Sequence, residues 1–149
     1  MKRWLFLMLV AVILPSGGTD IGKLQPVQVV CVMRENGMVV ISTDTGDRGV
    51  GRDLQSAIVD MDACAIGEIF LETADHLLLG QECLPMVEQM AQILRPSCTI
   101  SLVAGAPNLE AVGAFLTFHG PGITLMEYRA GRRELQTLIT ADGRMHLVP

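Results

Sequence analysis

The residues best able to do chemistry in this chain are its three histidines and four cysteines. His76 follows Asp75 in the segment ETADHLLLG, and Cys83 lies a little further along the chain. A histidine oriented by a carboxylate can activate a thiol, so His76 with Cys83 or Cys64 would suit a small hydrolase or a redox enzyme. Asp75 and His76 would, however, point to opposite faces of an extended segment. We therefore interpret this segment as a polar bend between two apolar stretches.

Neither of the other two histidines has an obvious catalytic partner. His119 ends a predicted helix, where a donor or a cation suits the last backbone carbonyl groups. His146 lies in the final predicted strand. The chain also contains no G-x-S-x-G or H-E-x-x-H sequence, so no enzyme class can be assigned. We assign no catalytic residues and expect a protein that is not an enzyme.

Two aspartates and three glycines gather at the start of the stretch TDTGDRGVGRDLQSAIVDM, residues 43–61. A calcium loop beginning at Asp44 would need oxygen ligands at its third and twelfth positions, which here are Gly46 and Gln55. A phosphate loop would need the lysine and hydroxyl of G-x-x-x-x-G-K-[ST], and the glycines do not space as G-x-G-x-x-G either. We therefore assign no metal and no cofactor to the chain.

We interpret the same stretch as a flexible turn between a strand and a helix. Gly49 and Gly51, like the glycine before them, would supply backbone angles that bulkier residues resist. Asp53 would cap the first turn of the helix. Asp44 and Asp47 are expected to be ordinary surface residues whose replacement costs little stability.

The cysteines are widely spaced and form no C-x-x-C pair, so neither a zinc site nor thioredoxin-like redox chemistry is indicated. In an exported chain they could form disulfides, with three possible pairings. Buried free thiols are the alternative that we favour, because free cysteine is among the most buried residue types. The four are Cys31, Cys64, Cys83 and Cys98.

Nine methionines raise the question of a soft-metal site, since thioether sulfur can bind copper(I). Met61, Met86 and Met90 fall within predicted helices but form no M-x-x-M array. We expect them to fill the hydrophobic core instead.

The chain opens with MKRWLFLMLVAVILPSGG, in which two cations precede an unbroken apolar run from Trp4 to Leu14. This is the layout of an export signal, and a run of about eleven residues is short of the ~20 that span a bilayer. We predict that residues 1–18 are a signal peptide or short membrane anchor and that residues 19–149 form the domain, outside the cytoplasm. A buried N-terminal element of a cytosolic protein is the alternative, and whether the signal is cleaved stays open.

Composition bounds the class of protein. The 149 residues are 50% hydrophobic and 18% charged, which is enough for one domain with a substantial core. The formal net charge is -5, aromatic residues make up only 4%, and no basic stripe could neutralise a phosphate backbone. We therefore expect no nucleic acid as a partner, and no small-molecule ligand can be assigned.

Strand-like and helix-like segments alternate along the chain. Two β-branched runs flank Asn36-Gly37, a dipeptide that favours a tight hairpin turn, and a second hairpin is predicted around residues 141–143. Apolar periodicity and capping residues predict helices over 54–61, 84–94 and 107–119, and further strands over 68–72, 76–80, 98–104, 123–128, 134–140 and 144–149. The sequence thus predicts an α/β (α+β) fold: a single domain with a mixed β-sheet, about three packed helices and β-hairpins at both ends.

Four segments carry a family resemblance. They are TDIGKLQPVQVV with Asp20, Ile21 and Leu24, the glycine-led helix GRDLQSAIVDM, the phrase HLLLGQE at 76–82, and PSCTISLVAGAPNLEAVGAFL. Together they resemble the N-terminal domain of the C-subunit of bacterial spore germinant receptors, the Ger(x)C family. The family's lipid-bearing cysteine has no counterpart directly after the apolar run, where the nearest cysteine is Cys31.

The resemblance implies a non-enzymatic component of a membrane receptor assembly. On that basis we expect a non-catalytic, exported or membrane-associated protein of spore formation or germination that acts through protein contacts. Its partners would be other membrane or germinant-receptor proteins at the outer face of the cell or spore inner membrane. The small Cys/His-dependent hydrolase or redox enzyme remains the competing hypothesis.

Overall fold

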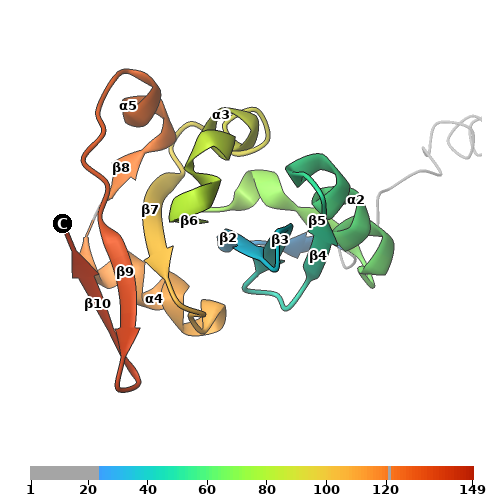
Figure 1. Ribbon diagram of the computed structural model, residues 1–149, viewed down its shortest axis with the longest axis horizontal. Coiled ribbons are helices and arrows are strands. Elements are labelled where there is room, and N and C mark those ends of the chain that lie inside the picture. The colour runs from blue at the N-terminus through green and yellow to red at the C-terminus, as the bar shows by residue number, and fades with distance from the viewer. Residues whose placement is uncertain (1–23, 121) are drawn as a thin grey trace, which may run out of the picture.

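A computed structural model of the protein describes residues 24–120 and 122–149. The predicted signal segment, residues 1–18, lies outside the described part of the chain. The described residues form one mixed α+β domain, as the sequence predicts, with a large mixed sheet and a separate two-stranded sheet (Figure 1).

The large sheet has the strand order β10-β9-β7-β6-β2-β3-β4, with β8 also paired to β7. Neighbours β2, β6, β7 and β9 run parallel, whereas β3, β4, β8 and β10 pair antiparallel with their neighbours. Its strands are β2 (Val29–Glu35), β3 (Met38–Thr43), β4 (Arg48–Gly51), β6 (His76–Gly80), β7 (Thr99–Ala104), β8 (Ile123–Thr124), β9 (Thr137–Ala141) and β10 (Arg144–Val148). The small sheet pairs β1 (Leu24–Pro26) in parallel with β5 (Glu68–Phe70).

Two hydrophobic cores lie on opposite faces of the large sheet. Because side chains alternate along a strand, Leu77 and Leu79 of β6 enter one core while Leu78 enters the other. The first core is covered by α2 (Leu54–Cys64), α3 (Val87–Met90) and α5 (Leu125–Arg129), and the second by α4 (Leu109–His119). In Figure 1, α3 and α5 accordingly lie above the central strands and α4 lies below them.

Both predicted hairpins are confirmed. Asn36 and Gly37 have φ values of 51° and 80° between β2 and β3, and Asp142 and Gly143 have φ values of 51° and 71° between β9 and β10. Positive φ at both central residues is the turn geometry whose twist matches that of the flanking strands. The two-residue turns are consistent with the register of both hairpins, which pairs Glu35 with Met38 and Ala141 with Arg144.

Two of the predicted elements are wrong in kind or extent. The segment 84–94 is not one helix: a 3-10 helix covers Gln81–Met86, with Pro85 inside it, and α3 has only four residues. The predicted strand 123–128 is mostly helix α5. Thr124 and Glu127 form a capping box there, and the T-x-x-E spacing was a local signal of a helix start.

The predicted flexible turn after β3 contains a strand that the sequence did not suggest. Strand β4 pairs with β3 from Arg48 to Gly51, and α2 packs directly on it. Of the three glycines in this stretch, only Gly46 has a positive φ, of 91°. The expectation of special backbone angles is therefore wrong for Gly49 and Gly51. These two residues are glycine because the backbone of α2 occupies the space in which a Cβ would lie.

The prediction that Asp53 caps α2 is confirmed. Its carboxylate accepts a hydrogen bond from the backbone N–H of Ser56 at 2.8 Å, and the backbone N–H of Asp53 donates to the Ser56 hydroxyl oxygen. The bond from the Ser56 backbone, more than any other contact, lowers the pKa of Asp53.

We expect Asp53→Ala to lower the thermal midpoint of unfolding by a few degrees, because the backbone N–H of Ser56 at the start of α2 loses its acceptor. Asp53→Asn is the matched control, since its side-chain oxygen can still accept from Ser56. Differential scanning calorimetry at neutral pH measures both. Equal midpoints for Asp53→Ala and the wild type would show that the cap contributes nothing.

Candidate functional site

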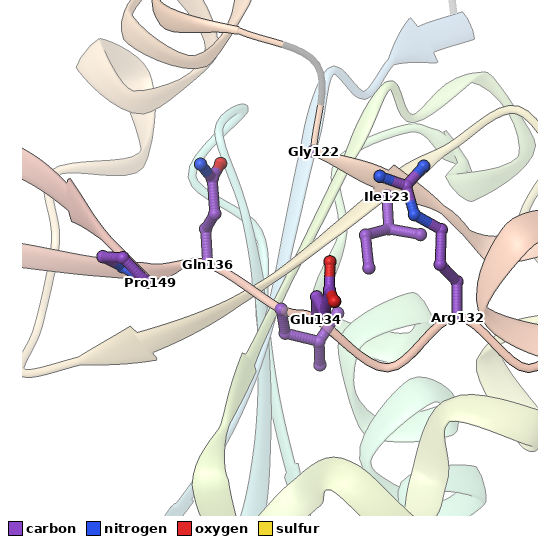
Figure 2. A pocket seen from close by; sticks show the side chains of 7 residues that line it. Gly122, Ile123, Arg132, Glu134, Gln136 and Pro149 are labelled. Carbon is purple, nitrogen blue, oxygen red and sulfur yellow. The ribbon is translucent and has the colours of Figure 1, made fainter.

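An open cleft lies where two strands share one edge of β7. Strand β8 pairs with the first residues of β7 and β9 with the last, so the two strands diverge between these pairings. The cleft has a volume of about 420 Å³. It is lined by Gly122, Ile123, Arg132, Glu134, Leu135, Gln136 and Pro149 (Figure 2).

The walls of the cleft are held by backbone and side-chain bonds. The carbonyl of Gln136 accepts a hydrogen bond from the backbone N–H of Leu102 at 2.8 Å, which ties the wall to β7. Arg132 pairs with Glu127 at 2.8 Å. The pKa of Glu127 is lowered chiefly by the backbone N–H of Thr124 and also by Arg132. In Figure 2 the Gln136 and Glu134 side chains stand out from these walls, so the cleft offers an amide, a carboxylate and the apolar side chain of Ile123.

Beside this cleft, β10 is an edge strand. In a two-residue hairpin the residues flanking the turn exchange both ladder bonds, so Arg144, His146 and Val148 bond inward to β9. The backbone N–H and C=O groups of Met145 and Leu147 therefore face outward. Among the described residues β10 pairs only with β9. An extended peptide could add to this edge as a further strand.

The opposite edge of the sheet is protected. The backbone N–H of Val50 in β4 donates to the carboxylate of Asp60, on α2, at 2.8 Å. Helix α2 also packs across β4. An added strand would therefore clash with the helix and could not bond to the Val50 N–H, which already donates to Asp60. Of the two edges, β10 is therefore the one open to a partner.

His76 is buried, and its exposed fraction is 8%. Its Nδ1 lies 2.7 Å from the Thr99 hydroxyl, and its Nε2 lies 3.4 Å from the hydroxyl of Thr117 on α4. Burial lowers the pKa of His76. The neighbouring Asp75 points elsewhere and pairs with Arg95, which confirms that the two side chains diverge.

His76 should make the protein less stable as the pH falls. Its folded-state pKa is depressed, so below its ordinary value of about 6.5 the unfolded chain binds more protons than the folded chain. Urea unfolding between about pH 7.5 and about pH 5.5 should show this loss in the wild type but not in His76→Gln. Parallel slopes in wild type and His76→Gln would contradict the assignment.

The structure does not bring the proposed catalytic pair together. His76 bonds to α4 on one face of the sheet, whereas Cys83 and Cys98 belong to the core on the other face. Cys64 is exposed at the end of α2, which lies over β3 and β4. The imidazole and these thiols thus occupy different parts of the fold.

All four cysteines are free thiols, and three are buried. Burial raises the pKa of Cys31 and of Cys98 to about 12, and burial likewise raises the pKa of Cys83. A thiol with a raised pKa is a poor nucleophile, because only the thiolate reacts. The preference for buried free cysteines is confirmed for Cys31, Cys83 and Cys98 and is wrong for the exposed Cys64.

We expect iodoacetamide to label Cys64 in the native protein while the three buried cysteines react only after unfolding. Intact-mass measurement over time should show one modification, and peptide mapping should place it at Cys64. Addition of denaturant should release the other three sites. Rapid labelling of Cys83 in the folded protein would instead support the enzyme hypothesis.

The remaining candidates have structural positions. Met61 and Met90 are fully buried in the first core and Met86 packs against it, which confirms their role as core residues. His119 is exposed in the last turn of α4, with its ring centroid 4.5 Å from that of Phe115. In the part of the chain that the structure describes, no group of three His, Cys, Asp or Glu side chains is placed to hold a metal ion.

The cleft and the open edge were not predicted. Both depend on how β8, β9 and β10 meet β7, and no motif within any one of these segments encodes that meeting. The predicted pair of strands over 134–140 and 144–149 was the nearest available signal.

No protein-family model, no curated protein and no solved structure matched the chain. The resemblance to the Ger(x)C family therefore stays a prediction. Within residues 24–120 and 122–149, no helix is long and apolar enough to cross a membrane.

Proposed function

We propose that this protein is a non-catalytic partner-binding protein of bacterial spore formation or germination that acts outside the cytoplasm, at the membrane. The resemblance of the residue pattern to the Ger(x)C family and the signal-like N-terminus support the biological setting. The open edge of β10 beside the β8–β9 cleft supports the mode of action.

Strand addition is the contact that this surface suits best. A partner segment paired with β10 would bond to the outward groups of Met145 and Leu147. Pro149 follows β10 and lines the cleft, so a strand that ran along this edge could place a side chain there. In such complexes the main-chain bonds supply affinity and the pocket supplies selectivity. The partners would be other membrane or germinant-receptor proteins.

Complementation of a deletion strain tests both parts of the proposal. Loss of the protein should impair sporulation or nutrient-triggered germination, and the wild-type gene should restore it. Met145→Pro removes one outward N–H and leaves the inward ladder intact, so it should fail to restore the phenotype. Met145→Leu is the control, because it retains both the N–H and an apolar side chain of similar size. Thermal unfolding of both purified variants checks that they fold.

Three results would overturn the proposal in different ways. A deletion strain that sporulates and germinates like its parent would remove the biological role. Full restoration by a folded Met145→Pro protein would remove strand addition at β10. Recovery of the protein only in the cytoplasmic fraction would remove the extracytoplasmic location.

A further inference from the structure

A second concave surface lies far from the β10 edge in the sequence. Two cavities, of about 450 and 410 Å³, share Gln55, Ile58 and Ile93 and so form one continuous trough between α2, β5 and the segment after α3. We call it the α2–β5 trough. It is lined by Asp53, Leu54, Gln55, Ile58, Asp62, Glu68, Ile69, Phe70, Leu71, Glu72, Gln89, Gln92 and Ile93.

The lining combines apolar, amide and acidic side chains. Ile58, Ile69 and Ile93 are only partly buried, although they pack against the first core. The lining includes four carboxylates and no lysine or arginine. A complementary occupant would carry apolar side chains together with positive charge.

The described chain begins at this trough. Strand β1 starts at Leu24, whose partner in β5 is Glu68, and the whole of β5 lines the trough. Leu24, which follows residue 23 directly in the chain, therefore lies beside Glu68. Their first part, MKRWLFLM, has two cations followed by apolar residues, which is the chemistry that the trough complements.

We propose that the α2–β5 trough binds residues 2–8 of the same chain when the N-terminal segment is present and no membrane is available. Trp4 and the apolar residues after it would cover the partly buried isoleucines, and Lys2 and Arg3 would lie among the carboxylates. The chain between Met8 and Leu24 could span roughly 50 Å when extended, so it can reach any part of the trough. The trough thereby shields from water an apolar segment that would otherwise bind a membrane or aggregate.

The inference does not depend on the proposed role in spores. It concerns the N-terminal segment in the absence of a membrane, when the segment would bind to its own domain. Experiments on the purified protein without membranes test it, so their failure would leave the proposed function standing.

Trp4 is the only tryptophan of the chain and reports directly on this contact. In the full-length purified protein, its fluorescence should peak at a shorter wavelength than in the urea-unfolded protein, because a docked indole leaves water. The shift should not depend on protein concentration. Acrylamide should quench the docked indole less than the unfolded one.

Neighbouring residues of α2 supply matched variants. Ile58 lines the trough, whereas Val59 is 58% exposed and lies outside it. Ile58→Asp should return the emission toward that of the unfolded chain, and Val59→Asp should leave it unchanged. Gln55→Lys, at an exposed position of the trough, should also release Trp4 by repelling Lys2 and Arg3, with little risk to the core.

Each alternative occupant gives a different result. A shift that disappears on dilution would show that the segment binds a second copy. Emission typical of exposed indole that shifts only on adding anionic phospholipid vesicles would show that the segment binds membranes and not the trough. A shift that survives both Ile58→Asp and Gln55→Lys would place Trp4 elsewhere on the protein. Any of these three results overturns the proposal.

Discussion

Replacing Gly49 with alanine should destabilise the protein by about 3 kcal/mol or more, at or above the upper end of ordinary overpacking. A Cβ at this position would lie 2.0 Å from the carbonyl oxygen of Ala57 and 2.5 Å from the backbone nitrogen of Met61. These are backbone atoms of α2, so no side-chain rotation can relieve the clash. The helix would have to move away from β4, and the buried contacts of Ala57 and Met61 would be lost with it.

Gly80→Ala is the matched control. A Cβ there would be 3.6 Å from the nearest atom, the Cα of Met33, which is an ordinary contact. Gly80 also has a φ of -60°, which alanine adopts freely. Urea unfolding should therefore separate the two variants by several-fold in free energy. Similar stabilities for Gly49→Ala and Gly80→Ala would show that α2 can be displaced from β4 without cost.

Asp44→Ala should cost about 1 to 3 kcal/mol, because two backbone donors lose a charged acceptor. The expectation that Asp44 is an ordinary surface residue is wrong. One of its carboxylate oxygens accepts from the backbone N–H groups of Gln28 and Val29, each at 3.0 Å. Its own N–H donates to the carbonyl of Val29. The hydrogen bonds of Asp44 therefore connect the turn after β3 to the beginning of β2.

Asp47→Ala tests whether this effect is specific. The Asp47 side chain accepts only from the hydroxyl of Thr45 among the bonds that the structure gives it, so its loss should stay within roughly 0.5 kcal/mol. Asp44→Asn should recover part of the stability, since it retains a neutral acceptor oxygen. Chemical denaturation of the three variants measures the differences. Equal losses for Asp44→Ala and Asp47→Ala would contradict the anchoring role of Asp44.

Both predictions concern the stretch from Thr43 to Met61, whose pattern predicts the local cap correctly but not the long-range contacts. Asp53 was recognised as a cap because its partner, Ser56, lies three residues away. The partners of Asp44 lie 15 and 16 residues away, and those of Gly49 belong to a helix packed over it. Nothing in the spacing of the stretch could show that these groups meet.

The candidate surface follows the same division. The final hairpin was predictable, since Asp142 and Gly143 accept positive φ at the turn. The place of this hairpin at the edge of the sheet was not predictable. Strand β9 pairs with β7, although α4, β8 and α5 separate the two strands in the sequence. The cleft exists only because β8 takes the first part of that edge of β7 and β9 takes the rest.

The order of residues was enough to predict the mixed α+β class, the two hairpin turns and the cap at Asp53. These features depend on backbone conformation and on neighbours within a few residues, which the order of residue types specifies directly. Tertiary structure alone decided that His76 and Cys83 lie on opposite sides of the sheet, that α2 rests on two glycines, and that β10 keeps an open edge. Those outcomes depend on which distant segments pack together, and the same local patterns are compatible with many such packings.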